Sequence, residues 1–206
     1  AAADLVGISM ALAPGDACYV PLRHGAVAPA DGQGGLDFSA VPAQQSQQIA
    51  FDQAIALIKP IFEDPGILKI GHNLKYDYHI LMQGRNGGIA LAPVDDTMCL
   101  SYVLDGGRVD RHSMDFLAGH WLDHQTIKFE DVCGKGTKQV PFNAISPELA
   151  LNYAAEDADI TLRLWQLLKP RLAGEGVTSV YERLERPLIP ILARMENSGI
   201  TVDRSI

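Results

Sequence analysis

The chain is poor in cysteine and has no long apolar run. Its three cysteines, Cys18, Cys99 and Cys133, lie far apart and form no C-x-x-C pair, which argues against a disulfide framework or a zinc site. No window is long enough to span a membrane, and the N-terminus lacks the basic start and apolar stretch of a signal peptide. We therefore expect a cytoplasmic protein with reduced thiols and no membrane partner.

Basic charge is also scarce. The formal net charge of −8 at pH 7 argues against a protein that grips duplex DNA through a broad basic face. It does not exclude a nuclease, because nuclease carboxylates are covered by divalent cations. With 206 residues and 47% hydrophobic content, the chain can bury a sizeable core, as one large domain or as one domain plus a remnant.

The most informative stretch runs from residue 146 to residue 168. Ser146 followed by Pro147 is typical of a helix N-terminus. One predicted helical face then carries these residues: Leu149, Tyr153, Asp157, Ile160, Leu164, Leu167 and Leu168. An unpaired carboxylate in an apolar stripe is costly, so Asp157 should face a cation, a donor cluster or a cleft. The alternative, an ion pair with a core arginine and a packing role for Tyr153, stays open. We expect Glu156 and Asp159 to be solvated.

A second acid interrupts an apolar stripe on the helix predicted over 74–83. Asn73 is placed to cap this helix, and Asp77 shares a face with Leu74, Tyr78 and Leu81. An acid near a helix start is often only a favourable partner of the helix dipole. That alternative stays open for Asp77.

The remaining pattern predicts a mixed α/β chain. Residues 4–13 and 17–22 are expected to form a β-hairpin, and residues 67–70 and 89–94 are expected to be strands. Helices are expected over 47–61, 97–104, 114–122 and 177–197, the second capped by Asp96 and the third by Ser113. Residues 23–45 are expected to form an exposed loop, and residues 130–143 a basic surface loop.

Two acids on apolar helix faces, one with a tyrosine a turn away, suggest carboxylates gathered around divalent cations. Their contexts, NLKYD at 73–77 and YAAED at 153–157, resemble the second and third motifs of the proofreading 3′–5′ exonuclease domains of bacterial DNA polymerase I, in family A. The resemblance continues in the same order through 96–98, 111–114 and 134–142. It implies an RNase H-like mixed β-sheet flanked by helices, and hydrolysis of the 3′-terminal phosphodiester of DNA by a two-metal mechanism.

The resemblance also implies roles for single residues. Asp157 would bind a divalent metal directly, Asp77 would hold a second ion partly through water, and Tyr153 would orient the attacking water. The metal would be Mg²⁺ or Mn²⁺, with Zn²⁺ as an alternative. The partner would be the single-stranded 3′ end of DNA, in a groove lined by Asn73, Lys75, Tyr76, Arg111 and Phe129. For Tyr76 and Phe129, core packing is the alternative.

The first motif of the resembled family, an Asp-x-Glu on a preceding strand, does not occur in this sequence. We therefore expect a sheet that lacks its first strand, weak or absent metal binding, and little or no nuclease activity from this chain alone. Residues 194–203 resemble the entry into a polymerase body. This favours an exonuclease-like domain over 1–175, with residues 176–206 starting the polymerase domain of the same chain. The alternative is a non-catalytic DNA-binding or structural module of a polymerase.

Overall fold

The computed structural model describes residues 3–25 and 48–201. Most of the loop expected over 23–45, and the end of the stretch 194–203 that resembles the entry into a polymerase body, lie outside them. Two strands, β1 (Gly7–Ala13) and β2 (Asp16–Pro21), form the predicted antiparallel hairpin. Two more, β3 (Lys69–Gly71) and β4 (Val94–Asp96), pair in parallel. Among the described residues the two pairs form separate sheets, which agrees with a mixed sheet that lacks an interior strand.

The strand predicted over 89–94 is wrong for most of its length. β4 starts only at Val94, directly after Pro93. Proline has no N–H to donate to a neighbouring strand, so the residues up to Pro93 are poorly suited to a ladder. Ile89 and Leu91 are nevertheless buried, so the apolar run supplies core side chains without forming a strand.

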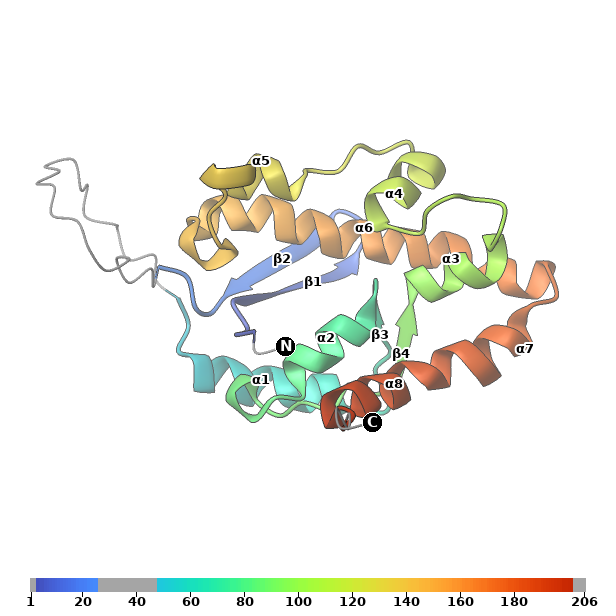
Figure 1. The fold of residues 1–206 in the computed structure, drawn as a ribbon, viewed down its shortest axis with the longest axis horizontal. Helices are drawn as coiled ribbons and strands as arrows, with labels where there is room; N and C mark the ends of the chain where they lie inside the picture. Colours follow the sequence, from blue (N-terminus) through green and yellow to red (C-terminus); the bar gives the residue numbers. More distant parts are fainter. Residues whose placement is uncertain (1–2, 26–47, 202–206) are drawn as a thin grey trace, which may run out of the picture.

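Helices make up most of the described chain (Figure 1). They are α1 (Phe51–Glu63), α2 (Leu74–Leu81), α3 (Thr97–Asp105), α4 (Met114–Leu122), α5 (Phe129–Cys133), α6 (Pro147–Gly174), α7 (Thr178–Val180) and α8 (Arg186–Ser198). A π-helical turn, η4 (Tyr181–Glu185), joins α7 to α8. The prediction of a loop over 130–143 is wrong, because α5 and two 3₁₀ turns occupy much of this segment.

Helix α6 is the long helix on which the other elements assemble. It packs against both strands of the hairpin, against β3, and against α3 and α4 (Figure 1). Ser146 caps it as predicted, its Oγ accepting from the Leu149 N–H at 3.3 Å. The helix continues past the predicted end to Gly174.

The buried face of α6 differs from the predicted stripe. Leu149 and Leu167 are exposed, so their assignment to the core is wrong. The buried positions are Ala150, Ala154, Ile160, Thr161, Leu164, Leu168 and Leu172. Two of these are alanines, Ala150 and Ala154, which give a weak hydrophobic signal in sequence.

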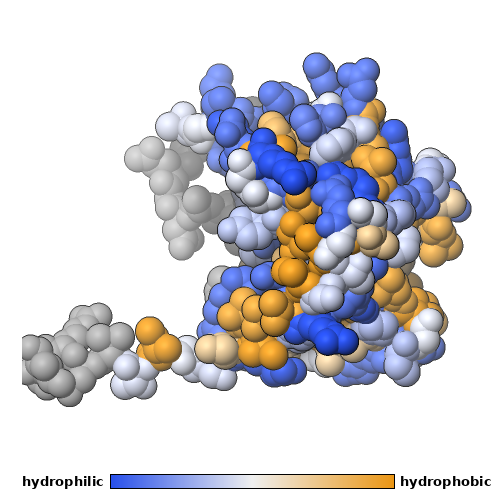
Figure 2. Space-filling model, turned by 90° about the vertical axis from the view of Figure 1, so that its right-hand side faces the viewer, coloured by the Kyte–Doolittle hydropathy of each residue, from blue (hydrophilic) through white to orange (hydrophobic). Residues whose placement is uncertain are grey.

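The apolar core has two main parts. One contains the hairpin, α1, α2 and α8, and the other contains α3, α4, the C-terminal half of α6 and Tyr181. Several large apolar side chains remain exposed on η4 and α8, namely Leu184, Leu188, Ile191, Leu192 and Met195. Apolar residues also form a band between polar ones at the end of the molecule where α7 lies (Figure 2).

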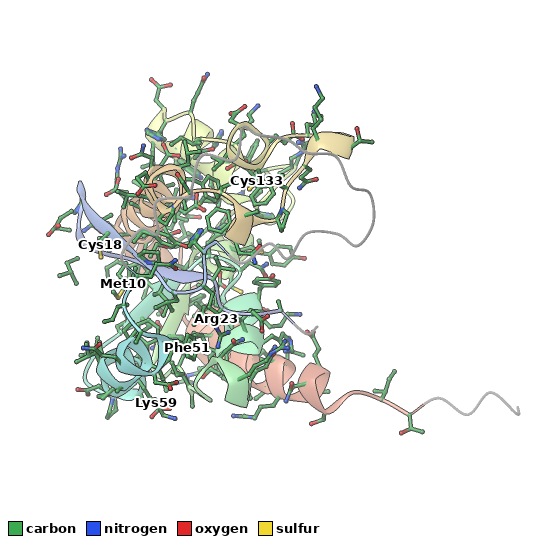
Figure 3. The ribbon with its side chains drawn as sticks, turned by 90° about the vertical axis from the view of Figure 1, so that its left-hand side faces the viewer. Met10, Cys18, Arg23, Phe51, Lys59 and Cys133 are labelled. Carbon is green, nitrogen blue, oxygen red and sulfur yellow. The ribbon has the colours of Figure 1, made fainter. Side chains whose placement is uncertain are left out.

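Arg23 connects the end of the hairpin to α1. Its guanidinium lies 3.8 Å from the centroid of the Phe51 ring (Figure 3), and its Nη1 donates to Asn86 Oδ1 at 3.0 Å. Cys18, labelled in the same view, carries a free thiol, as do Cys99 and Cys133. The prediction of unpaired cysteines is confirmed.

Candidate functional site

The start of α2 is fixed by a residue of β4. The Asp96 carboxylate accepts from the Asn73 N–H at 3.1 Å and from the Leu74 N–H at 2.8 Å. It also accepts from the Met98 N–H at 2.8 Å, at the start of its own helix. Asn73 lies in the left-handed region, with φ of 56°, and makes no side-chain cap. Asn73 occupies the N-cap position of α2 as predicted, but the expected side-chain cap is wrong. The strand register places Gly71 opposite Asp96, and the Asp96 carboxylate takes the N–H groups instead.

Asp77 lies in the first turn of α2. Its side chain is accessible to water, yet protein atoms surround the carboxylate closely enough that desolvation, with a further contribution from Asp96, raises the pKa to about 7. No lysine, arginine or histidine among the described residues forms an ion pair with Asp77.

Asp157 and Tyr153 lie one turn apart on α6 and interact. The Tyr153 hydroxyl is within hydrogen-bonding reach of the Asp157 carboxylate. Desolvation, with Asp115 and Glu156 nearby, raises the pKa of Asp157 to about 7. Burial and the Asp157 charge raise the pKa of the Tyr153 phenol. The structure shows no arginine paired with Asp157 in the described part of the chain, which removes the ion-pair alternative there.

One oxygen of Asp157 has no partner. Its Oδ1 is buried and makes no hydrogen bond to any described residue. A buried carboxylate oxygen without a donor is costly to ionise, and a cation would offset that cost. Carboxylate oxygens are the ligands that Mg²⁺ and Mn²⁺ prefer. The donor chemistry of this position therefore fits a divalent metal.

Two aromatic rings, those of Phe129 and Phe142, lie close to Tyr153. The ring centroid of Phe129 lies 6.1 Å from that of Tyr153, and the centroid of Phe142 lies 5.9 Å from Tyr153 and 6.2 Å from Phe129. Phe129 is 38% exposed, so it both packs and presents an accessible edge. Tyr76 is 58% exposed, and the core-packing alternative for it is wrong.

His72 lies near acids of both regions. Asp96 and Asp115 each act to raise its pKa, but desolvation dominates and lowers the pKa overall. Asp96 also raises the pKa of Asp77, and Asp115 also raises the pKa of Asp157. In addition, β3 contacts α6 and ends at the turn that starts α2 (Figure 1). His72 thus lies between an acid that is near Asp77 and an acid that is near Asp157, and no direct contact between Asp77 and Asp157 is found among the described residues.

The structure does not bring every predicted residue into one group. Tyr153, Asp157 and Phe129 lie together, while Asn73, Lys75, Tyr76 and Asp77 lie together at the start of α2. Arg111 is exposed before α4 and contacts neither group in any described interaction. Among the described residues, no set of three or more His, Cys, Asp or Glu side chains is arranged to hold a metal.

The expected solvation of Glu156 and Asp159 is wrong. Glu156 Oε2 accepts from the Ile127 N–H at 2.6 Å, and its Oε1 lies 2.8 Å from His124 Nε2. Asp159 Oδ1 accepts from the Gly15 N–H at 2.6 Å. These carboxylates hold the segment before α5 and the hairpin turn against α6. Neither partner is near in sequence, so helical spacing gave no signal of it.

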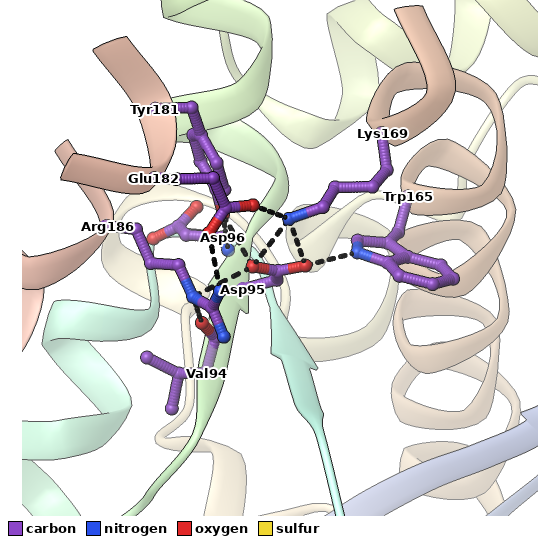
Figure 4. Close-up of polar contacts among 8 residues, drawn as sticks. All are labelled: Val94, Asp95, Asp96, Trp165, Lys169, Tyr181, Glu182 and Arg186. Carbon is purple, nitrogen blue, oxygen red and sulfur yellow. Dashed lines mark hydrogen bonds and ion pairs between the residues drawn. The ribbon is translucent and has the colours of Figure 1, made fainter. Parts of the chain in front are cut away.

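Sequence reasoning also missed a buried charge cluster around Asp95 (Figure 4). The fully buried carboxylate lies 2.9 Å from Lys169 Nζ and 3.2 Å from Arg186 Nε, and it accepts from Trp165 Nε1 at 2.7 Å. Glu182 pairs with both cations at 2.6 Å. The cluster ties β4 to α6, η4 and α8. Its signal in sequence was two adjacent acids directly after an apolar run.

Solved structures define the class of protein. NrnC of Brucella melitensis with bound Mg²⁺ matches with a TM-score of 0.54 and 25% identity, covering 68% of this chain and 63% of that chain. The POL domain of Pol1 from M. smegmatis, in complex with DNA primer-template and dNTP, matches with a TM-score of 0.66 and 23% identity, covering 97% of this chain and 27% of that one. The fold is that of RNase H-like 3′–5′ exonuclease domains.

Sequence relatives define the family. A family model described as 3′–5′ exonuclease matches residues 1–173. DNA polymerase I of Rhizobium leguminosarum is 47% identical over 99% of this chain, and that of Pseudomonas aeruginosa is 43% identical over 99%. The chain belongs to the 3′–5′ exonuclease family of DNA polymerase I. It spans about a fifth of the length of these relatives, 20% and 21% respectively.

In the described ranges, every helix is either too short or too polar to cross a bilayer.

Proposed function

We propose that this chain supplies Asp77, Tyr153 and Asp157 to a metal-dependent site that hydrolyses the 3′-terminal phosphodiester of a single DNA strand. The observation that carries the proposal is the Asp157 carboxylate, which has a buried oxygen without a partner and the Tyr153 hydroxyl beside it. A carboxylate kept in the core of a fold at such cost is typical of a functional site. The family of the chain agrees with this chemistry.

The residues would divide the work as follows. Asp157 would hold one divalent ion directly, and Asp77 would hold a second, partly through water. Bound divalent ions would activate water and stabilise the charge that develops on the phosphate oxygens. Tyr153 would orient the attacking water, since its hydroxyl is raised in pKa and stays protonated at neutral pH.

The strand would bind beside these acids. Asn73, Lys75 and Tyr76 at the start of α2, with Phe129 and Arg111, offer an amide, cations and accessible aromatic faces. Amides and cations suit phosphate and sugar, and aromatic rings stack on bases of any sequence. The partner we propose is therefore the single-stranded 3′ end of DNA, and in the whole protein this end would come from a mispaired primer.

We further propose that residues 1–175 form the exonuclease-like domain and that residues 176–206 begin the polymerase domain. The long helix α6 ends at Gly174, and Gly176 follows with φ of 72°. The exposed apolar side chains of η4 and α8 would then be covered by the polymerase domain of the same protein.

The test measures release of nucleotide from a 3′-labelled single strand by the full-length polymerase that contains this chain. We expect release to require Mg²⁺ or Mn²⁺ and to fall about 100-fold or more in Asp157→Asn. Asp131→Asn changes the charge equally at an exposed position of α5 and should leave the rate unchanged. Parental release by Asp157→Asn would contradict the proposal and favour a non-catalytic DNA-binding module.

The same assay applies to the isolated 206-residue chain. The resemblance implies four metal-binding acids, and this sequence contains two of them. We propose that the chain alone releases little or no nucleotide, because two carboxylates bind a pair of ions weakly. Turnover equal to that of the full-length protein would show that Asp77 and Asp157 suffice.

A further inference from the structure

One acid of helix α8, Glu196, forms ion pairs with two basic side chains of α2. Glu196 Oε1 lies 2.5 Å from Lys75 Nζ, and Glu196 Oε2 lies 2.7 Å from His79 Nε2. Lys75 and His79 are one turn apart on α2, so a single carboxylate spans both basic side chains. Lys75 is at the same time the cation that our functional proposal places beside the DNA strand.

This contact adds little to stability. The side chains of Lys75 and Glu196 are 37% and 48% exposed, and ion pairs of this kind contribute about 0–1 kcal/mol. Other contacts already hold the two helices together, since Ile189 and Ala193 of α8 are buried in the core that includes α2. The main consequence of Glu196 is therefore the charge that it places next to Lys75.

A DNA phosphate and Glu196 compete for the same ammonium. Lys75 can donate to a phosphate oxygen, but a phosphate near its Nζ would also lie close to the Glu196 carboxylate, and like charges repel. The two residues that follow Lys75 offer no second cation, because Tyr76 is uncharged and Asp77 is acidic, and His79, one turn away, is held by the same Glu196 carboxylate. Binding of a strand at Lys75 thus requires the carboxylate to move away or to tolerate the repulsion.

We propose that Glu196 masks Lys75 and thereby weakens binding of single-stranded DNA at the start of α2. The inference rests on the proposed role of Lys75 in strand binding. Because Glu196 belongs to α8, the position of α8 sets how much of the Lys75 charge a strand can use. Any movement that withdraws α8 from α2 would strengthen binding.

The experiment compares binding of a fluorescent oligothymidylate by the 206-residue chain, without divalent metal, in a series of Glu196 and Lys75 variants. Glu196→Gln should bind about 2- to 5-fold more tightly at low salt, the equivalent of one surface charge contact. The slope of log affinity against log salt should steepen by about 0.7, as for one added phosphate contact on a single strand. The affinity of Glu196→Asp, which has a shorter side chain, should lie between that of the parent and that of Glu196→Gln.

Two controls make the result specific. Asp52→Asn, at an exposed position of α1, removes the same charge and should leave affinity unchanged. In a Lys75→Ala background, Glu196→Gln should no longer tighten binding. Far-UV circular dichroism on every variant confirms that α2 and α8 remain folded.

The possible failures are distinguishable. If Lys75→Ala leaves the affinity unchanged in the Glu196→Gln background, where nothing masks the ammonium, then the proposed role of Lys75 is wrong and the inference falls with it. If Lys75→Ala weakens binding but Glu196→Gln leaves it unchanged or weaker, the role of Lys75 stands and the masking is wrong. An equal gain from Glu196→Gln with and without Lys75 would also overturn the masking.

Discussion

Asp96 shows that one side chain can start two helices. Its carboxylate accepts from backbone N–H groups of α2 and of α3, and the residue is only 2% exposed. The sequence predicted the local cap of α3 because Asp96 directly precedes that helix. It could not predict the cap of α2, because that contact depends on the parallel pairing of β3 and β4.

We expect Asp96→Ala to lower the free energy of unfolding by about 2–4 kcal/mol, because each lost cap costs about 1–2 kcal/mol. Urea denaturation followed by circular dichroism measures this. Ser146→Ala removes a single cap from α6 and should cost about 1 kcal/mol. Equal losses in the two variants would show that Asp96 supports only one helix.

His72 gives a prediction for the dependence of stability on pH. Its pKa is lowered, first by desolvation, and its buried Nε2 has no partner among the described residues. The groups facing it are Thr97, at 2.9 Å from Nδ1, and the charges of Asp96, Asp115 and His112. A lowered pKa means that the folded state holds His72 neutral while the unfolded chain takes up a proton below about pH 6.5.

His72 should therefore stabilise the fold fully above about pH 6.5 and lose that contribution as the pH falls. The raised pKa values of Asp77 and Asp157 act in the opposite sense, so the comparison with a variant isolates His72. We expect the loss of stability between pH 7 and pH 5 to be smaller in His72→Gln, by at most about 2 kcal/mol. Thermal unfolding at both pH values measures it, and identical losses in parent and variant would contradict the assignment.

At the scale of elements, the sequence predicted the helices and strands better than it predicted the contacts between them. The hairpin, α3, α4 and the start of α6 are confirmed, because turn residues and the caps Asp96 and Ser146 act locally. The prediction that the Ser113 side chain caps α4 is wrong, since it makes no cap hydrogen bond. The prediction of which face of α6 is buried was partly wrong, because alanine carries little hydrophobic signal. The carboxylates of Glu156 and Asp159 were assigned to solvent, although the hairpin turn and the segment before α5 cover them.

We expect the charge cluster around Asp95 to be essential for holding β4 against α6, η4 and α8. Asp95 is fully buried and contacts α6, η4 and α8. Removing one partner of a buried ion pair leaves charge without compensation. We expect Asp95→Ala to lower the free energy of unfolding by about 3–5 kcal/mol, measured by urea denaturation.

Glu182→Gln is the matched control for that cluster. Its side chain is 31% exposed, so its loss should cost about 1 kcal/mol or less. If Asp95→Ala costs no more than Glu182→Gln, then packing rather than charge holds β4 against α6 and α8.

At the scale of the whole molecule, α8 presents apolar residues on its outer side while its inner side joins the core of α2 and the hairpin. The sequence predicted a helix here. It could not predict the contact of Glu196 with Lys75 and His79, because those residues lie more than a hundred positions away in the chain.

Hydroxyl-radical footprinting tests whether the polymerase domain covers this side. Met195 is 61% exposed in the described chain. Its oxidation rate should fall several-fold in the full-length protein, because the proposed domain contact excludes water from it. Tyr102 on α3 is 63% exposed and should react at the same rate in both proteins. Equal rates for Met195 would place the polymerase domain elsewhere.

We propose that Asp77 and Asp157, on different helices, act in one site. The structure links them indirectly, since His72 lies near Asp96, the neighbour of Asp77, and near Asp115, the neighbour of Asp157. The pairing of roles rests on chemistry and family. Residues that work as a unit are strongly non-additive when removed together. The exonuclease rate of the full-length protein in Asp77→Asn, Asp157→Asn and the double variant measures this directly.

We expect each single variant to lose about 100-fold or more in the rate of 3′ nucleotide release, and the double variant to lose no more than about tenfold beyond the weaker single variant. Losses that multiply in the double variant, or a single variant that keeps the parental rate, would contradict one shared site.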